Sequence, residues 1–178
     1  MLDVGTGPGF FAIILAEMGF RVTAVDYTAS MLEEAGRNAG ALADKIDFRQ
    51  MNAEKLTFAD HSFDVLVTRN VTWNLHDPEA AYGHWTRVLA PGGALVYAVP
   101  GPRHLFGLKQ VLYDTPYENP CRPVDYPGFV REDERAVQST IRLEGGAIQD
   151  LFAMTPYYWK TPKEGAERLA KLEVLQTE

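Results

Sequence analysis

A glycine-rich turn near the start of the chain constrains the fold more than any other sequence feature. The run LDVGTGPG, residues 2–9, joins a short apolar segment, predicted to be a strand, to a helix-like segment that begins at Phe10. Glycine lets the backbone approach a ligand closely, and the first turn of a helix has free N–H groups that can bind one. The turn therefore predicts a cofactor site between a strand and a helix of an open α/β sheet.

The spacing of these glycines indicates the kind of ligand. A dinucleotide-binding turn has the pattern G-x-G-x-x-G, but Phe10 stands where its last glycine would be, so the pattern here is G-x-G-x-G. A carboxylate at Asp3 is unfavourable beside a pyrophosphate and favourable beside a cation, so a ligand with an ammonium and a sulfonium group fits the turn. A tight turn in which Asp3 only caps backbone is the alternative. The turn residues predicted to bind cofactor are Asp3, Gly5, Thr6, Gly7 and Gly9.

Strand-like and helix-like segments alternate through the first hundred residues. Ser30 and Glu33 have capping-box spacing, and Asp77 before Pro78 is a typical helix start. Because the apolar strands lack polar alternation, we predict a doubly wound, mostly parallel sheet with helices on both faces. The predicted strands are 1–4, 21–27, 46–51, 63–68 and 94–99, the last after a turn at 91–93, and the predicted helices are 10–18, 30–42 and 77–89.

Composition excludes several classes of protein. The formal net charge of −7 disfavours general nucleic-acid affinity, and no apolar stretch is long enough to span a bilayer. The single cysteine, Cys121, cannot form an internal disulfide or a thiolate zinc cluster. We therefore expect a cytoplasmic protein without a metal site and without membrane attachment.

At this point the residues resemble the class I S-adenosylmethionine-dependent methyltransferases, because LDVGTGPG is similar to their first motif, D-x-G-x-G-x-G. The resemblance implies that Asp26, at the end of the second strand, holds the ribose hydroxyls, and that Tyr27 lies against the adenine. Asn52 and Ala53 stand where the family usually has Asp-Ala, so Asn52 is expected to accept a hydrogen bond from the adenine amino group. Asn70 ends the fourth strand, at the rim where such sheets bind ligands, and is expected to contact cofactor or acceptor.

The two halves of the chain resemble different members of this class. The first half, through the segment RNVTWNL at 69–75, is similar to general methyltransferase domains of the ubiquinone/menaquinone type. The second half resembles bacterial 23S rRNA guanine-N1 methyltransferases, but it has no cysteine-ligated zinc module. We expect residues 1–100 to form the S-adenosylmethionine-binding half, and residues 101–178 the acceptor-side half, of the same single Rossmann-like domain.

Beyond residue 100 the pattern is less regular. The segment 101–134 is rich in proline, tyrosine and charge, with one predicted helix at 105–112, a strand at 136–143 and helices at 148–152 and 162–172. Compared with the family, the chain would begin inside the first strand and stop before the last one. We therefore expect a fold that is truncated at both ends, with the strand at 136–143 lacking its neighbour.

The sequence thus predicts a methyltransferase that uses S-adenosyl-L-methionine and acts on a small molecule or on a guanine of rRNA. An NAD-dependent oxidoreductase and a non-catalytic cofactor-binding domain are alternatives, and the glycine spacing counts against the former. Transfer from a sulfonium is an in-line displacement that depends on alignment more than on covalent catalysis. For this reason no catalytic residue is predicted. The sequence also predicts no oligomeric state.

Overall fold

The computed structural model describes residues 1–69, 71–120 and 126–178. The chain divides into two compact units, which we call unit 1 (Met1–Val99 with Val124–Arg131) and unit 2 (Pro100–Pro123 with Glu132–Glu178). The assignment of residues 101–178 to the acceptor side stays a prediction.

Unit 1 is built on a five-stranded sheet whose order is β3-β2-β1-β4-β5. Every neighbouring pair in it is parallel, which confirms the predicted sheet. Val4, at the end of the central strand, pairs with Val25 on one side and with Thr68 on the other, so three strands end at one edge. The strands are β1 (Leu2–Val4), β2 (Val22–Asp26), β3 (Ile46–Gln50), β4 (Phe63–Arg69) and β5 (Leu89–Ala98).

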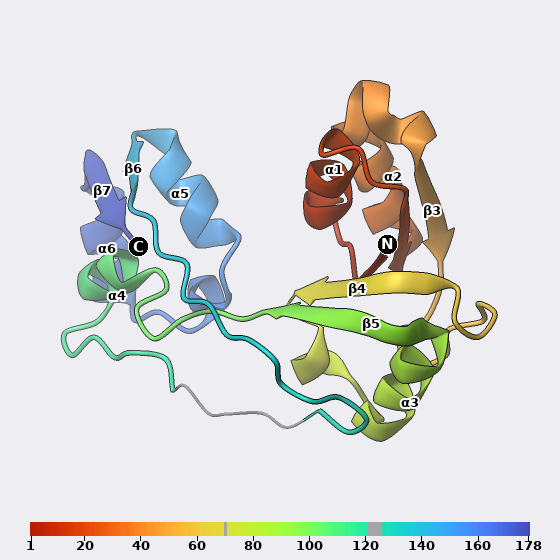
Figure 1. Ribbon diagram of the computed structural model, residues 1–178. Helices are drawn as coiled ribbons and strands as arrows, with labels where there is room; N and C mark the ends of the chain where they lie inside the picture. Colours follow the sequence, from red (N-terminus) through yellow and green to blue (C-terminus); the bar gives the residue numbers. More distant parts are fainter. Residues whose placement is uncertain (70, 121–125) are drawn as a thin grey trace. The chain divides into compact units, whose positions relative to one another are not determined.

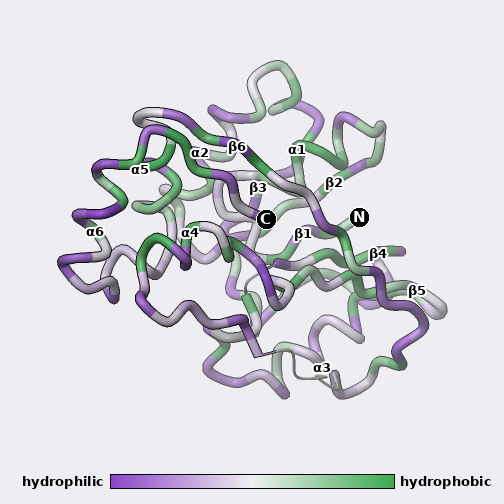
Figure 2. The backbone as a smooth tube through the Cα atoms, turned by 90° about the vertical axis from the view of Figure 1, so that its left-hand side faces the viewer, coloured by the Kyte–Doolittle hydropathy of each residue, from purple (hydrophilic) through white to green (hydrophobic). Residues whose placement is uncertain are grey.

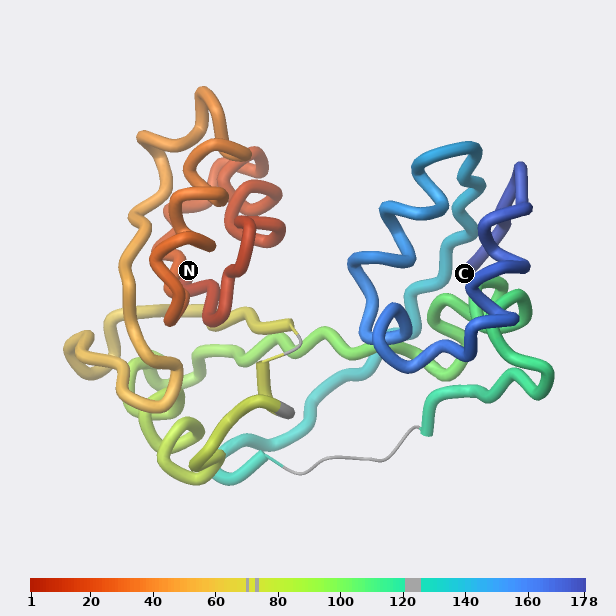
Figure 3. Tube along the Cα trace, turned by 180° about the vertical axis from the view of Figure 1, so that it is seen from behind, coloured from red at the N-terminus to blue at the C-terminus, as the bar shows by residue number. Residues whose placement is uncertain are grey.

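Helices cover both faces of this sheet, as a doubly wound fold requires. Helices α1 (Phe10–Glu17) and α2 (Ala29–Ala39) lie on one face and α3 (Pro78–Val88) lies on the other (Figures 1 and 3). Two short 3-10 helices, η1 (Gly40–Lys45) and η2 (Thr72–Asn74), lie in the connections. Helix α1 consists mainly of hydrophobic residues (Figure 2) and buries its small side chains, Ala12 and Ala16, against the sheet.

A larger core cluster lies between the other face of the sheet and α3. It includes Leu2, Leu66 and Trp85, all of which are fully buried. The loop between β3 and β4 contributes Leu56, which is 1% exposed, to the same cluster. Leu56 therefore attaches this loop to the core, while residues 59–62 of the loop are exposed.

Unit 2 has a core of its own. Its buried residues are Leu105, Leu108, Leu112, Ile148, Phe152, Leu169 and Leu175. Its elements are α4 (Phe106–Leu112), β6 (Ile141–Glu144), α5 (Gly146–Ala153), η3 (Pro156–Trp159), α6 (Lys163–Ala170) and β7 (Val174–Thr177).

The strand expected at 136–143 differs in extent and in its partner. It begins only at Ile141 and pairs antiparallel with β7, from Ile141 opposite Thr177 to Glu144 opposite Val174. The expectation that this strand lacks a neighbour is therefore wrong. The alternation typical of a strand becomes visible only in the structure, where Leu175 and Thr177 are buried and Val174 and Gln176 are exposed.

Two local predictions about unit 1 are also wrong. Strand β5 begins at Leu89, and the turn expected at 91–93 lies inside it, where the pairing with β4 shifts between Phe63 and Val65. Helix α2 begins at Ala29, so Ser30 does not cap it; Thr28 is the N-cap residue and its side chain makes no capping bond. The predicted Asp77 cap of α3 is confirmed, because its carboxylate accepts from Ala80 N–H at 3.0 Å.

Within the described ranges no helix is long and apolar enough to cross a membrane.

Candidate cofactor-binding site

The glycine turn after β1 has a backbone that glycine alone adopts readily. Gly5, Gly7 and Gly9 have φ angles of +71°, +53° and +92°, in the left-handed region. The N–H groups of Gly5 and Thr6 both donate to the carbonyl oxygen of Val25, at 2.9 and 3.0 Å. The turn is thereby held against the end of β2.

The three glycines differ in what surrounds them. A Cβ on Gly5 would overlap the side chain of Val71, and one on Gly9 would lie 3.1 Å from Ala35 Cβ, so both positions are needed for close packing within the protein. A Cβ on Gly7 would meet nothing within 4 Å. Gly7 therefore faces open space, and its side of the turn is where a ligand can approach the backbone.

Asp3 lies inside the turn. It is 2% exposed, and its Oδ2 accepts from Thr6 Oγ1 at 2.7 Å and from Ala12 N–H at 3.0 Å. Burial raises the pKa of Asp3 to about 6, although these two hydrogen bonds oppose the rise. The carboxylate thus fixes the turn to the first residues of α1. Direct contact of Asp3 or Thr6 with a cofactor stays a prediction.

Asp26 connects the end of β2 to the same turn. Its Oδ2 accepts from Gly7 N–H and its Oδ1 accepts from Thr28 N–H, both at 2.9 Å. A carboxylate can accept about four hydrogen bonds, so this one retains capacity for a diol. The next side chain, Tyr27, is 74% exposed. The Asp26 carboxylate therefore lies beside Gly7, and the exposed Tyr27 follows it directly in the chain.

The loop after β3 supplies the next two predicted residues. Met51 N–H donates to the carbonyl oxygen of Asp26 at 2.9 Å, which places the start of this loop beside the end of β2. Asn52 Oδ1 accepts from Glu54 N–H at 2.9 Å and has a second lone pair for another donor. The carbonyl oxygen of Ala53 accepts from Trp85 Nε1 at 2.9 Å.

The structure thus brings together most of the predicted residues. The loops that follow β1, β2 and β3 meet at one edge of the sheet because the strands are parallel. Asn70 lies outside the described residues. Trp85 was not predicted, although a buried indole N–H usually has a partner, which is the signal that could have drawn attention to it. No group of three His, Cys, Asp or Glu side chains in the described part of the chain could hold a metal ion.

The sheet order and the glycine turn beside an acidic strand end define the Rossmann-like fold of the class I methyltransferases. Residues 2–97 match the methyltransferase domain family, and the chain belongs to that family. Relatives include the demethylmenaquinone methyltransferase of Thermus thermophilus, 38% identical over 117 residues, with 64% of this chain and 53% of that protein covered.

A second relative extends further into unit 2. The ubiquinone biosynthesis O-methyltransferase of Paramagnetospirillum magneticum is 35% identical over 168 residues, covering 87% of this chain and 66% of that protein. The chain therefore spans between about half and two thirds of the length of these two relatives. Among solved structures, a SAM-dependent methyltransferase of Methanosarcina mazei matches with a TM-score of 0.52 and 31% identity, over 57% of this chain and 52% of that one.

Proposed function

We propose that this chain binds S-adenosyl-L-methionine at the edge of the unit 1 sheet and serves in methyl transfer to a small molecule of the quinone type. The observation that carries the proposal is the open space at Gly7 beside the Asp26 carboxylate. Membership of the methyltransferase domain family supports S-adenosyl-L-methionine as the ligand of this site.

The residues present fit this cofactor. Asp26 would accept hydrogen bonds from the ribose hydroxyls, and the Gly7 side of the turn leaves room for the ligand to lie against the backbone. The exposed ring of Tyr27 would cover one face of the adenine. Asn52, with its free lone pair, would accept from the adenine amino group, while Ala53 holds the adjacent backbone in place.

The mechanism follows from orientation. The bound cofactor supplies a methyl group on a positively charged sulfur. The hydrogen bond between Asp3 and Thr6 keeps the glycine turn rigid, and Asp26 keeps the end of β2 against it. The binding site is therefore formed before the cofactor binds, and little conformational entropy is lost on binding. Proximity and alignment then provide the rate enhancement, and no catalytic base is assigned.

The quinone acceptor rests on the names of two relatives, a demethylmenaquinone methyltransferase and a ubiquinone biosynthesis O-methyltransferase. A guanine of rRNA is the alternative acceptor from the sequence, and those names do not favour it. The net charge of −7 also disfavours contacts with a phosphate backbone. Unit 2 as the acceptor side, and a cytoplasmic location, stay predictions.

The first experiment measures cofactor affinity. Calorimetry with S-adenosylhomocysteine should show binding by the native chain, and Asp26→Ala should weaken it by about 1.5–3 kcal/mol, or roughly tenfold to a hundredfold, because hydrogen bonds to a charged group are lost. Asp47→Ala is the matched control: it removes an exposed carboxylate of β3 that pairs with Arg49 and should leave affinity unchanged. Equal affinity of the Asp26 and Asp47 variants would contradict the proposal, as would tighter binding of NAD.

The second experiment tests the acceptor. Transfer of a labelled methyl group is measured with demethylated quinones and, separately, with rRNA fragments. We expect label in the quinone fraction. Efficient labelling of a guanine instead would overturn the quinone proposal and leave the cofactor site standing.

A further inference from the structure

We propose that Trp85 is a positioning residue for adenine recognition, acting on Asn52 through a single peptide plane. The inference rests on the proposed cofactor site, and it concerns a residue of α3, on the face of the sheet opposite α1. Trp85 is fully buried, and its only side-chain donor, Nε1–H, donates to the carbonyl oxygen of Ala53.

The argument begins with the peptide bond that follows Ala53. The carbonyl oxygen of Ala53 and the N–H of Glu54 belong to one planar unit. Trp85 Nε1 holds the oxygen of that plane at 2.9 Å, and the N–H of the same plane donates to Asn52 Oδ1, also at 2.9 Å. Rotation of this plane would therefore move the donor that orients the Asn52 side chain.

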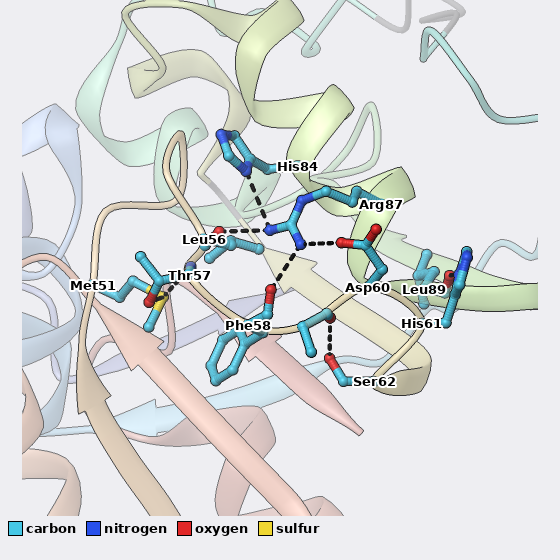
Figure 4. A network of polar contacts seen from close by, with 11 residues as sticks. Met51, Leu56, Thr57, Phe58, Asp60, His61, Ser62, His84, Arg87 and Leu89 are labelled. Atoms are coloured by element: carbon cyan, nitrogen blue, oxygen red, sulfur yellow. Dashed lines mark hydrogen bonds and ion pairs between the residues drawn. The ribbon is translucent and has the colours of Figure 1, made fainter.

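Helix α3 holds the rest of this loop as well. The guanidinium of Arg87 donates from Nη2 to the carbonyl oxygen of Leu56 and from Nη1 to that of Phe58, both at 2.7 Å (Figure 4). Nη1 also pairs with Asp60 at 2.6 Å. The loop between β3 and β4 has no regular secondary structure, so side chains of α3 supply partners for three of its carbonyl groups.

The start of α3 is attached to the same loop. The carboxylate of Glu54 accepts from the backbone N–H groups of His76 and Asp77, the latter at 3.2 Å. Ala53 is thus held by Trp85, near the end of α3, and Glu54 is held by the backbone at the start of the same helix. Of these contacts, the Trp85 bond alone acts directly on the peptide that orients Asn52.

The test compares two ligands that differ at one edge of the base. S-adenosylhomocysteine has the adenine amino group, and S-inosylhomocysteine has a carbonyl oxygen in its place and a proton on the adjacent ring nitrogen N1. The native chain should prefer the first. Trp85→Phe keeps an aromatic ring and removes the N–H; it should reduce this preference roughly three- to tenfold, the value of one neutral hydrogen bond. A general loss of folded protein would lower the apparent affinity for both ligands equally and leave the ratio of the two affinities unchanged.

A double-mutant cycle shows whether the effect passes through Asn52. Asn52→Ala should abolish the preference, and adding Trp85→Phe to it should change the ratio no further. Trp159→Phe is the matched control, since Trp159 is 83% exposed and lies in unit 2. Should Trp85→Phe fail to fold, replacement of Trp85 by benzothienylalanine takes its place in the cycle, because this residue keeps the two-ring shape and lacks the N–H that donates to Ala53.

The outcomes separate the two proposals. An unchanged ratio in Trp85→Phe, or an additive effect with Asn52→Ala, overturns the positioning role. Equal binding of both ligands by the native chain overturns it too, while the cofactor site stands. Absence of binding to either ligand overturns the proposed function itself.

Discussion

The two units use their polar side chains in opposite ways. In unit 1 the Asp26 carboxylate makes two backbone hydrogen bonds and keeps further acceptor capacity beside open space at Gly7. In unit 2 the buried ammonium of Lys109 donates to the carbonyl oxygen of Tyr117 at 3.1 Å and to Asn119 Oδ1 at 2.7 Å. The two charges differ in their surroundings: the carboxylate lies next to open space at a strand end, whereas the ammonium is buried and is paired within its own unit.

The surroundings of Lys109 support this distinction. Its side chain is fully buried, and the nitrogen lies 4.3 Å from the centre of the Tyr117 ring, within cation–π range. Burial lowers the pKa of Lys109. Arg168, which is exposed, also has partners within unit 2: it donates to the carbonyl oxygens of Val111 and Leu112 at the end of α4, at 2.9 and 3.2 Å. The contacts of Lys109 therefore account for its burial by its role in the fold.

The largest expected effect tests whether each unit depends on its own core. Leu66→Ala in β4 and Leu169→Ala in α6 each remove a fully buried side chain, and each should cost about 2–5 kcal/mol of unfolding free energy. Amide hydrogen exchange should show lost protection in β1 and β4 for the first variant and in α4 and α6 for the second. Equal loss across both units in either variant would show that they unfold as one body.

The next effect concerns the buried carboxyl of unit 1. Its pKa is 3.8 in the unfolded chain and about 6 in the folded one, so between these values the folded state holds more protons and stability falls as pH rises. Asp3→Asn should remove this decline. The native chain should lose about 2 kcal/mol relative to the variant between pH 4 and pH 7, measured by urea unfolding. A difference that stays constant with pH would show that Asp3 is not the titrating group.

The smallest expected effect tests whether Lys109 of unit 2 serves the stability of the fold and not ligand binding. Lys109→Met keeps the length of the side chain but removes the donor to Tyr117 and Asn119, and it should cost about 1–2 kcal/mol of stability. Lys163→Met is the control, because Lys163 is exposed and lies 3.8 Å from Glu167 in a surface pair that is worth little. Affinity for S-adenosylhomocysteine should stay within twofold in both variants. A large loss of affinity in Lys109→Met would give this residue a part in the site.

Much of unit 1 could be predicted because its signals are local. The glycine turn, the apolar runs and the Asp77 cap each depend on residues a few positions apart, and the predicted parallel sheet followed from them. The start of α2 was predicted wrongly because the spacing of Ser30 and Glu33 indicated a capping box, whereas the helix begins at Ala29 and Asp26 accepts from Thr28 N–H before it. In unit 2 the short segments gave weaker signals, and the pairing of β6 with β7 was missed.

By itself, the sequence determined the class of fold and the location of the glycine turn, since glycine conformations and strand periodicity are properties of neighbouring residues. Only the tertiary structure decided the direction of the Asp3 carboxylate, which depends on Ala12, and the bond from Trp85 to Ala53, across 32 positions. Such contacts form when distant segments pack into one core, and a linear pattern does not specify which buried donor meets which carbonyl oxygen.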